Sequence, residues 1–548
     1  MRLSEAETIT TAAAAGVTVF DTARAYPDNE ALLAAALRRA GAESRARVVT
    51  KGGMARVGDR WVPDGRAKTI RSDCEASLAA LDGVPIDLYL VHAPDPRTPW
   101  ATTVRALARL VDEALVRRVG VANVNRERLD DALALAPIAA VQVALSLVDD
   151  AAVRGGVLER CAEAGVAVIA HSPLGGPRRA PTLVRNEALA AVAARLGATP
   201  AEVALAWLLQ LAPNVVAIPG ARRPETARSA VRAATLELAE EDREALTRAF
   251  DRRAPARAAR TRRPAGDGEV VIVMGIPGAG KSRIAEEYVA RGYVRINRDE
   301  RGGSLLGVAD ALDDELAGGT PRVVLDNTYL TRASRSYVVE TANSHRLPVR
   351  CVWLDTPLAQ AQVNLVTRLL DRFGSLPTPE ELQDRARREQ GLLAPTSQMR
   401  AVRELEPPST DEGLAAVEKR EFLRVFDGPA KAGVLVAAAA LAQPDWQHSL
   451  DAGDRTAPHL VFDWHPDGSA RDVDAEIDRL SGAVSGRVEG AVCPHGGGPP
   501  RCWCRPPLPG LPLAFARRHG IDLSRSVVIG ASAPHLTLAR AIGARYVS

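Results

Sequence analysis

The sequence predicts an α/β protein with several domains, the first of which is a parallel (β/α)8 barrel. The length of 548 residues is too great for one ordinary hydrophobic core. Residues 1–250 alternate short β-rich segments with helical segments rich in Ala, Leu and Arg, which is the pattern of a parallel α/β domain. Residues 268–426 and 427–548 contain further strand-like and helical segments, so we expect two smaller α/β domains after the barrel.

Seven strands are expected in the barrel, each ending in a polar or glycine-bearing turn. An eighth would have to precede residue 1, because the chain begins with a helix-like segment, Leu3–Ala15, and an unclosed barrel would expose an edge strand. The expected strands are Val17–Phe20, Arg47–Thr50, Asp87–Val91, Arg118–Ala122, Ala140–Leu145, Ala167–Ala170 and Val215–Ile218. Since C-terminal strand ends converge on one face of a barrel, one mouth should be lined by Asp21, Lys51, His92, Asn123, Gln142, Ser172 and Gly220.

This part of the chain resembles the aldo-keto reductase family over nearly all of residues 8–235. The resemblance rests on separate motifs that follow the family's order. They are Gly-Val-Thr-Val-Phe-Asp21-Thr-Ala-Arg-Ala-Tyr26, Val-Val-Thr-Lys51, Asp-Leu-Tyr-Leu-Val-His92, Val-Gly-Val-Ala-Asn123, Val-Gln142, His-Ser172-Pro-Leu-Gly and Ile-Pro-Gly220. The resemblance implies a small carbonyl substrate and a nicotinamide cofactor, NADPH or NADH.

Four of these residues, Asp21, Tyr26, Lys51 and His92, are expected to be catalytic. Carbonyl reduction needs hydride on carbon and a proton on oxygen, so a phenol with an ordinary pKa of about 10 must release its proton near neutral pH. Lys51 beside Tyr26 would favour the phenolate, Asp21 would keep Lys51 charged, and His92 would orient the carbonyl oxygen. The alternative for any one of them alone is a polar strand end without chemistry.

The resemblance also implies which residues bind the cofactor. Asn123 and Gln142 would bind the nicotinamide carboxamide, and the loops around Ser172 and Gly220 would bind the phosphates. Two positions depart from the family pattern besides the absent first strand. His171 stands where an aromatic ring often stacks on nicotinamide, and the last loop lacks the usual Lys-Ser pair. The 2′-phosphate contact would then come from Arg222, Arg223 or Arg228.

A basic segment and a phosphate-binding motif follow the barrel. Residues 251–267 are rich in Arg, Ala and Pro, and form either a solvated tether or a contact with a phosphate backbone. The motif Gly275-Ile-Pro-Gly278-Ala-Gly280-Lys281-Ser282 lies between the expected strand Val270–Met274 and helix Ser282–Arg291, which is the setting of a P-loop NTPase. Its backbone N–H groups would bind ATP phosphates, Lys281 would contact the β- and γ-phosphates, and Ser282 would bind Mg²⁺.

The next segments resemble the kinase domain of polynucleotide 5′-kinases. They are Gly-Tyr-Val-Arg-Ile-Asn297-Arg298-Asp299, Val-Val-Leu-Asp326-Asn327-Thr328, Ala-Ser-Arg335-Ser-Tyr337, Pro407-Pro408-Ser-Thr-Asp-Glu412-Gly413 and Phe-Leu-Arg-Val-Phe426. The resemblance implies that nucleic acid 5′ ends are the acceptor, with Asp299 as the base and Asp326 and Arg335 at the substrate. A lid arginine, Arg368 or secondly Arg372, would stabilise the transferring group.

Each of these kinase residues also has a simpler interpretation. Asp299 could cap a helix, Arg368 could lie on a solvated helix face, and a small-molecule kinase would share the phosphate loop.

A cluster of metal-ligand residues lies near the C-terminus. Cys493-Pro-His495 and Cys502-Trp-Cys504 offer four ligands within twelve residues, which predicts a structural tetrahedral Zn²⁺ site. Together with Gly-Ile-Asp-Leu-Ser-x-Ser-Val-Val-Ile-Gly530, these motifs resemble zinc-bearing haloacid dehalogenase (HAD)-type phosphatases of the histidinol-phosphate group. Asp463 is a possible nucleophile, but the partner aspartate, the lysine after Arg505 and the later Mg²⁺-binding acids are absent. We therefore expect this HAD-like domain to be inactive.

Composition and charge indicate a globular protein. The balance of 46% hydrophobic and 25% charged residues is typical of globular proteins, and a net charge of +3 does not indicate a nucleic-acid binder. The N-terminus has no signal-peptide pattern and no apolar run approaches the ~18 residues of a membrane helix. We expect a cytoplasmic bifunctional enzyme of unspecified oligomeric state, a carbonyl reductase and polynucleotide kinase involved in nucleic-acid repair. The alternatives are a nucleic-acid kinase with a non-catalytic barrel, or a reductase fused to a small-molecule kinase.

Overall fold

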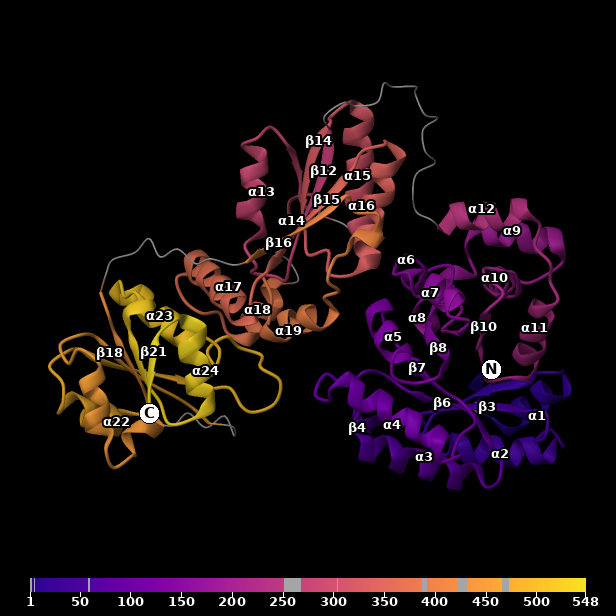
Figure 1. Ribbon diagram of the computed structural model, residues 1–548, viewed down its shortest axis with the longest axis horizontal. Helices are drawn as coiled ribbons and strands as arrows, with labels where there is room; N and C mark the ends of the chain where they lie inside the picture. The colour runs from indigo at the N-terminus through magenta and orange to yellow at the C-terminus, as the bar shows by residue number, and fades with distance from the viewer. Residues whose placement is uncertain are drawn as a thin grey trace. The chain divides into compact units, whose positions relative to one another are not determined.

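The computed structural model describes residues 2–3, 5–57, 60–250, 268–302, 304–386, 392–421, 431–465 and 473–548 (Figure 1). The chain divides into two compact units, residues 1–262 and 263–548. The basic segment at 251–267 and the motif ending at Phe426 lie outside the described residues.

The first unit is built around a seven-stranded parallel sheet with the strand order β10-β9-β8-β7-β6-β3-β2. All seven expected strands are present, each within two residues of its predicted ends. Neighbours in sequence are neighbours in the sheet, as in a (β/α)8 barrel. The strands are β2 (Val19–Asp21), β3 (Arg47–Gly52), β6 (Ile86–Val91), β7 (Val119–Ala122), β8 (Ile138–Ala144), β9 (Ala167–His171) and β10 (Val215–Ala217).

Helices connect these strands and cover the outer face of the sheet (Figure 1). The first turns of α5 and α10 are stabilised by the side chains of Asn125 and Thr199, which accept backbone N–H groups. The helices are α1 (Ala6–Ala14), α2 (Asn29–Arg39), α3 (Ala67–Leu81), α4 (Trp100–Asp112), α5 (Arg126–Leu133), α6 (Ala151–Arg154), α7 (Val157–Glu163), α8 (Gly176–Leu183), α9 (Glu187–Leu196), α10 (Pro200–Leu209), α11 (Pro224–Ala234) and α12 (Glu240–Phe250).

The sheet has a hydrophobic core on each face, as its two-sided apolar strands require. Alternate strand residues form a small core of Val49, Leu88, Leu90, Ala122, Ala140, Ile169 and Ile218. The other residues of the same strands, such as Val48, Tyr89 and Val121, pack against the helices. Residues from β3 and from the segment after β10 share the small core, which shows that the sheet curves toward closure.

The expectation that the chain begins directly with a helix requires correction. A short strand, β1 (Arg2–Leu3), precedes α1 and pairs in parallel with β11 (Gly220–Ala221), with Arg2 opposite Gly220. Helix α1 begins at Ala6 rather than at Leu3. The first strand is therefore reduced to two residues within the described chain.

The second unit begins with a five-stranded parallel sheet of order β13-β14-β12-β15-β16. The expected strand and helix around the phosphate loop are present as β12 and α13. The strands are β12 (Glu269–Met274), β13 (Val294–Ile296), β14 (Arg322–Asp326), β15 (Val349–Asp355) and β16 (Ala416–Glu421). The helices are α13 (Lys281–Val289), α14 (Arg298–Arg301), α15 (Leu305–Gly318), α16 (Arg332–Ser344), α17 (Leu358–Phe373), α18 (Pro379–Ala386) and α19 (Pro395–Glu404).

A second five-stranded parallel sheet completes this unit, with the order β19-β18-β17-β20-β21. Two of its strands, β18 and β20, correspond to the strand-like segments Leu460–Phe462 and Ser526–Ile529 that the sequence predicts. The strands are β17 (Val434–Ala437), β18 (His459–Trp464), β19 (Val488–Cys493), β20 (Val527–Ile529) and β21 (Arg545–Val547). The helices are α20 (Ala438–Leu441), α21 (Trp446–Ser449), α22 (Asp474–Ser481), α23 (Gly510–His519) and α24 (Ala533–Ile542).

Helix α17 joins the two sheets of the second unit. Its Val363 belongs to the hydrophobic core of the C-terminal sheet. Gln360 donates a hydrogen bond to the Ala541 carbonyl of α24 at 3.1 Å, and Asp371 pairs with Arg517 of α23. Helix α17 therefore connects the two α/β parts of this unit through several residues along its length rather than through one contact.

Candidate functional site

Lys51 and Asp21 form a buried ion pair at the C-terminal ends of neighbouring strands. Lys51 Nζ lies 2.7 Å from both Asp21 carboxylate oxygens and donates to the Thr22 carbonyl at 2.8 Å. The two side chains are only 1% and 2% exposed. Gln142, on β8, donates from Nε2 to Asp21 Oδ1 at 2.7 Å. Buried charges are tolerated when they are paired and hydrogen-bonded, and these contacts meet that condition.

Tyr26 and His92 lie beside this ion pair. Lys51 Nζ is 5.8 Å from the centre of the Tyr26 ring, and the rings of Tyr26 and His92 meet edge to face at 5.8 Å. Both side chains are half-buried, so they line the barrel mouth while Lys51 and Asp21 lie beneath it. The structure thus brings the four predicted proton-handling residues together at one end of the sheet.

A hairpin that the sequence analysis did not anticipate adds an aromatic side chain to this mouth. Strands β4 (Met54–Val57) and β5 (Arg60–Pro63) pair antiparallel directly after β3. Trp61 on β5 is 48% exposed and lies 6.1 Å from the rings of both Tyr26 and His92. The sequence contained a signal for it, because Gly58-Asp59 separates two short segments of strand-forming residues.

A hydrogen-bonded ion pair follows the hairpin. Arg66 donates from Nε and Nη2 to the two carboxylate oxygens of Asp64, at 2.8 and 2.5 Å. This contact lowers the pKa of the Asp64 carboxyl to about 2. The Asp64 backbone N–H also donates to the Gly53 carbonyl at 3.0 Å, which closes the base of the hairpin.

Two of the predicted cofactor-binding residues have an unusual backbone. Asn123 and Ser172 have positive φ angles of 57° and 52°. Residues other than glycine rarely adopt this backbone conformation, and those that do are often found at ligand sites. His171 lies between them, with Nε2 3.1 Å from Asn123 Oδ1 and Nδ1 3.2 Å from Ser172 Oγ. Asn123 also donates to the His92 carbonyl at 2.9 Å. These contacts fix a polar rim at the ends of β7 and β9.

The remaining predicted cofactor residues of the barrel lie near the end of the sheet. Gly220 belongs to β11 and is exposed. Arg222, Arg223 and Arg228 follow it and are exposed as well, so their guanidinium groups are available for an anionic ligand. Gln142 differs from the others, because it is buried and its amide already donates to Asp21.

The phosphate loop has the glycine conformations that its motif requires. Gly278 and Gly280 have φ angles of 86° and 93°, and a side chain at Gly278 would meet the Ala361 carbonyl oxygen at 2.3 Å. Lys281 folds back over the loop and donates to the carbonyls of Gly275 and Ile276 at 3.0 and 3.1 Å. Ser282 is exposed at the N-terminus of α13. The donor set therefore fits a nucleotide phosphate chain with Mg²⁺.

Side chains from segments distant in the sequence hold this loop, and no sequence pattern predicted their contacts with it. Asn364 of α17 donates to the Gly278 carbonyl at 2.8 Å, and Gln398 of α19 donates to the Pro277 carbonyl at 2.8 Å. Thr356 donates to the Ala279 carbonyl at 3.1 Å. Amide and hydroxyl side chains on helices carry no recognisable motif, so only the fold shows their role.

The two predicted kinase motifs after the phosphate loop lie side by side. Asn297 donates from Nδ2 to Asp326 Oδ1 at 2.7 Å, because β13 and β14 are adjacent parallel strands. Asp326 is 2% exposed and also pairs with Arg295 through two hydrogen bonds of 3.1 and 2.7 Å. Asp299 lies in the short helix α14, and its side chain is outside the described part of the structure.

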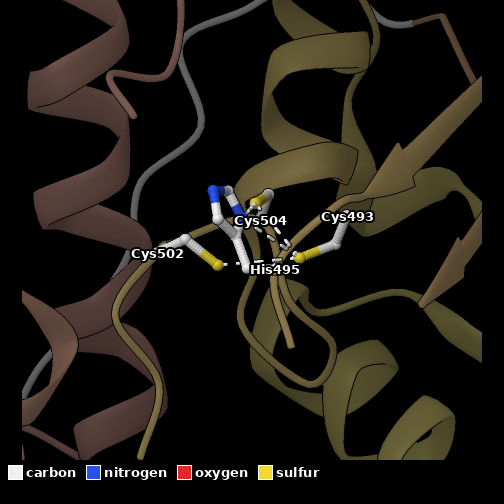
Figure 2. Close-up of side chains that lie close together, drawn as sticks. All are labelled: Cys493, His495, Cys502 and Cys504. Atoms are coloured by element: carbon white, nitrogen blue, oxygen red, sulfur yellow. Dashed lines mark hydrogen bonds between the residues drawn. The ribbon is translucent and has the colours of Figure 1, made fainter. Parts of the chain in front are cut away.

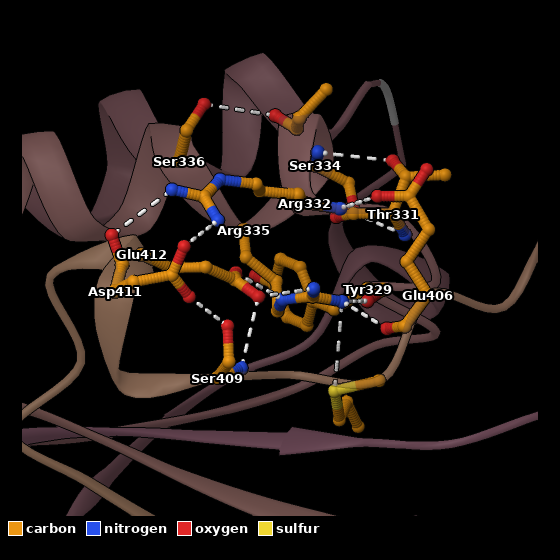
Figure 3. Close-up of polar contacts among 12 residues, drawn as sticks. Tyr329, Thr331, Arg332, Ser334, Arg335, Ser336, Glu406, Ser409, Asp411 and Glu412 are labelled. Atoms are coloured by element: carbon orange, nitrogen blue, oxygen red, sulfur yellow. Dashed lines mark hydrogen bonds and ion pairs between the residues drawn. The ribbon is translucent and has the colours of Figure 1, made fainter. Parts of the chain in front are cut away.

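Arg335, expected at the substrate, is instead a core residue (Figure 3). Its side chain is 0% exposed and pairs with both Glu412 carboxylate oxygens at 2.6 Å. Its Nη1 donates to the carbonyls of Tyr329 and Glu406 at 3.0 Å. All three nitrogens are bound by protein acceptors, so the expectation of a substrate contact is corrected to a structural role.

Arg368 and Arg372, the two candidates for a phosphoryl-stabilising arginine, lie on α17. Both are exposed, and Arg368 follows Asn364 by one helical turn. The exposure of Arg368 is compatible with a lid residue and equally with a solvated helix face, the two interpretations that the sequence left open.

The predicted metal ligands come together in the C-terminal sheet. Cys493, His495, Cys502 and Cys504 place their ligand atoms within 4.8 Å of one another, and Figure 2 shows them pointing toward one another. Cys493 Sγ lies 3.6 Å from Cys502 Sγ and 3.4 Å from Cys504 Sγ. A tetrahedral Zn²⁺ with Zn–S bonds of ~2.3 Å sets sulfur atoms about 3.8 Å apart, so the cluster fits this ion.

Asp463, kept as a possible nucleophile, ends β18 and lies 3.0 Å from His465 Nε2. The middle strand of this sheet, β17, is followed by the short alanine-rich helix α20, and β20 is followed by Gly530 and Ala531. Neither strand end supplies a carboxylate, and for β20 this agrees with the absence of the later Mg²⁺-binding acids from the sequence. The inactivity of this domain remains a prediction.

Among the described residues, no single helix is long and apolar enough to cross a membrane. One bent pair, α9 with α10, passes the same test of length and composition when its two helices are taken together.

The comparisons with known proteins match the two units to different families. Residues 2–250 match the model of the aldo/keto reductase family, and residues 270–391 match that of an AAA domain. Aldo-keto reductase str7 of Strobilurus tenacellus is 33% identical over 258 residues, which is 42% of this chain and 76% of that protein. Probable aldo-keto reductase 1 of Glycine max is 33% identical over 259 residues, or 41% and 73% of the two chains. A solved aldo-keto reductase of Klebsiella pneumoniae in complex with NADPH is 27% identical, covers 45% and 84% of the two chains, and has a TM-score of 0.39.

Proposed function

Because this chain belongs to the aldo/keto reductase family through residues 2–250, we propose that its barrel reduces a small aldehyde or ketone with NADPH. The observation that carries the proposal is the buried Lys51–Asp21 pair beneath Tyr26 and His92. A buried ammonium close to a phenol lowers the cost of removing the phenolic proton.

Each residue of the mouth then has a defined task. NADPH supplies the hydride that the carbonyl carbon receives. Tyr26 gives the proton to the carbonyl oxygen, and Lys51, fixed by Asp21, stabilises the phenolate that remains. His92, whose ring meets that of Tyr26, orients the carbonyl oxygen, and Trp61 covers the apolar part of the substrate.

The cofactor would lie along the polar rim of the sheet. Asn123 and Ser172, with their left-handed backbone and shared contact to His171, offer an amide and a hydroxyl in fixed positions. Gly220 leaves room for a phosphate, and Arg222 offers a cation for the 2′-phosphate of NADPH. Gln142 acts indirectly by holding Asp21.

Substitution of Tyr26 tests the reductase proposal. We expect Tyr26→Phe to lower kcat for a panel of aldehydes by about 10²- to 10⁴-fold, because the proton donor is lost while the ring remains. NADPH affinity, followed by quenching of protein fluorescence, should be unchanged. Tyr89→Phe is the matched control, since this buried tyrosine bonds to the Ile70 carbonyl away from the mouth. Equal turnover by Tyr26→Phe and wild type would rule out the assignment.

For the second unit, we propose that residues 268–421 transfer the γ-phosphate of ATP to the 5′-hydroxyl of a polynucleotide. The loop geometry from Gly275 to Ser282 supports ATP as the donor. The contact between Asn297 and Asp326 supports the acceptor, because it places both motifs of the polynucleotide kinase resemblance at one sheet edge. Asp299, which follows Asn297, is the proposed base.

Labelled phosphate transfer tests this proposal. Wild-type protein should transfer γ-phosphate from ATP to 5′-hydroxyl RNA or DNA, and Lys281→Ala should abolish transfer because the β- and γ-phosphates lose their cation. Lys419→Ala, an exposed lysine on β16 paired with Asp355, is the control. Asp299→Asn should bind ATP but not transfer phosphate. Transfer by Lys281→Ala would exclude the phosphate-loop assignment, and transfer to small alcohols alone would favour the small-molecule kinase.

A further inference from the structure

Trp503 lies between two of the candidate metal ligands and is buried against the kinase part of the second unit. Cys502 and Cys504 flank it in the sequence, and its side chain is 2% exposed. Its indole Nε1 donates to the Leu393 carbonyl, just before α19, at 3.1 Å. Its own carbonyl accepts from the Gly510 N–H at 3.0 Å, so the backbone is anchored on α23. Trp503 therefore reaches from the metal cluster into the other α/β part of this unit.

The apolar contacts of Trp503 centre on helix α17. A buried cluster contains Trp503 together with four residues on one side of that helix and three from neighbouring segments. These residues are Leu365, Val366, Leu369, Leu370, Leu382, Leu392 and Leu508. Because packed interiors respond to changes as small as one methylene, the position of this indole affects the position of α17.

The same stretch of α17 packs against the phosphate loop. The Ala361 carbonyl and the Leu365 side chain leave so little space at Gly278 that an added Cβ would lie 2.3 and 3.0 Å from them. Asn364 donates to the Gly278 carbonyl at 2.8 Å. From α19, which follows Leu393, Gln398 donates to the Pro277 carbonyl at 2.8 Å. Leu365 thus contacts the loop and shares a cluster with Trp503.

We propose that the metal-bound Cys/His cluster acts through Trp503 as a positioning device for the phosphate loop, so that metal loading of the C-terminal part sets the affinity of the kinase part for nucleotide. The proposal rests on the nucleotide binding proposed above. It gives the catalytically degenerate C-terminal part a function, because its metal loop becomes a structural element of the nucleotide site. Trp503 is a positioning residue here, since it does not contact the nucleotide.

The physical reason is the local rigidity that a metal provides. With Cys502 and Cys504 both bound to one Zn²⁺, the backbone on each side of Trp503 is fixed and the indole has one orientation. When the metal is removed, Trp503 keeps its hydrogen bonds to Leu393 and Gly510 and its apolar packing, but the two flanking cysteines lose the constraint that the metal places on the backbone. The contacts of Gln360 with Ala541 and of Asp371 with Arg517 are separate from the metal loop. Metal loss should therefore loosen the phosphate loop without separating the two parts.

Binding of MgATP to the full chain tests the proposal. We expect Trp503→Ala to weaken MgATP binding about tenfold, the usual size of an effect transmitted through packed side chains. Trp503→Phe keeps a ring but loses the bond to Leu393, so it should lie between Trp503→Ala and wild type. Trp446→Ala is the control, because Trp446 is also buried, at 6% exposed, in the C-terminal core but is absent from the cluster around Trp503. Thermal unfolding of the second unit, followed in the full chain, reports that each variant remains folded.

Metal removal is the second arm of the experiment. Cys504→Ser should lose bound zinc, measured by atomic absorption, and weaken MgATP binding as much as Trp503→Ala. Amide hydrogen exchange should rise in residues 275–282 in both variants, a change that a role confined to the C-terminal core would not cause. Unchanged MgATP affinity and exchange in the zinc-free protein would overturn the proposal, as would equal weakening by Trp446→Ala. Absence of MgATP binding by wild type would instead contradict the proposed kinase function.

Discussion

Two buried ion pairs, one in each unit, illustrate how similar chemistry serves different purposes. Lys51 and Asp21 are 1% and 2% exposed in the barrel, and Arg335 and Glu412 are 0% and 4% exposed in the second unit. Both cations also donate to backbone carbonyls. Burial and pairing alone therefore do not distinguish a catalytic cation from a structural one.

The neighbours of each pair make the distinction. Lys51 lies at a strand end, 5.8 Å from the half-buried Tyr26 ring that lines the mouth. Arg335 lies on α16 and contacts the segment that carries Glu406 and Glu412, so it joins chain segments about 70 residues apart in the sequence. A buried charge that borders a reactive group at an accessible mouth indicates chemistry, whereas one enclosed by carbonyls indicates a structural role.

Removal of the Arg335 charge should have the largest effect on stability. Arg335→Met leaves Glu412 buried without its partner, which should lower the free energy of unfolding of the second unit by about 3–5 kcal/mol. Calorimetry of the full chain would measure this change. Arg332→Met is the matched control, because Arg332 lies on the same helix and pairs with Asp411, whose side chain is 51% exposed. Its loss should cost less than about 1 kcal/mol.

Carbonyl reduction should be unaffected by Arg335→Met, because the barrel is a separate unit. A fall in reductase turnover that follows the loss of stability would contradict the structural assignment of this residue.

Removal of the Lys51 charge should affect the reaction more than the fold. We expect Lys51→Met to lower kcat for carbonyl reduction at least about 100-fold, because the phenolate of Tyr26 loses its cation. Asp21 keeps the Gln142 amide as a donor, so the free energy of unfolding should fall by only about 1–3 kcal/mol. Lys68→Met, an exposed lysine on α3, is the control. If Lys51→Met lost as much free energy of unfolding as Arg335→Met and kept its turnover, the Lys51–Asp21 pair would be structural rather than catalytic.

Most of the residues that were predictable share one property, which is that they lie at strand ends. The alternation of apolar runs located all seven long barrel strands, and the polar residues after them fell at one mouth because parallel strands point the same way. Asp21, Lys51 and His92 could be predicted in this manner, whereas Tyr26 lies in the loop after β2 and was identified from the motif that begins before Asp21. The Cys/His cluster was equally predictable, because its four ligands are close in the sequence.

The residues that were missed act through contacts distant in sequence. Nothing near Asn364 or Gln398 indicates that they bind the carbonyls of Gly278 and Pro277, since those contacts depend on how α17 and α19 pack. Arg335 was assigned to the substrate from a motif, although its environment is made by segments about 70 residues away. Sequence patterns identify local chemistry, and the fold determines which polar groups remain accessible.

A third ion pair, between Asp64 and Arg66, is more exposed to solvent than the two buried pairs. Its hydrogen bonds lower the pKa of Asp64 to about 2, but the Arg66 side chain is 72% exposed and solvent screens the attraction. Asp64→Asn should therefore lower the free energy of unfolding of the barrel by less than about 1 kcal/mol. Because the pKa of the folded state is depressed, this contribution is present above pH ~4 and is lost as the pH falls toward 2. Denaturant unfolding at pH 7 and near pH 3 would measure it, and a difference between variant and wild type that grows on acidification would show that the pair does not stabilise the hairpin.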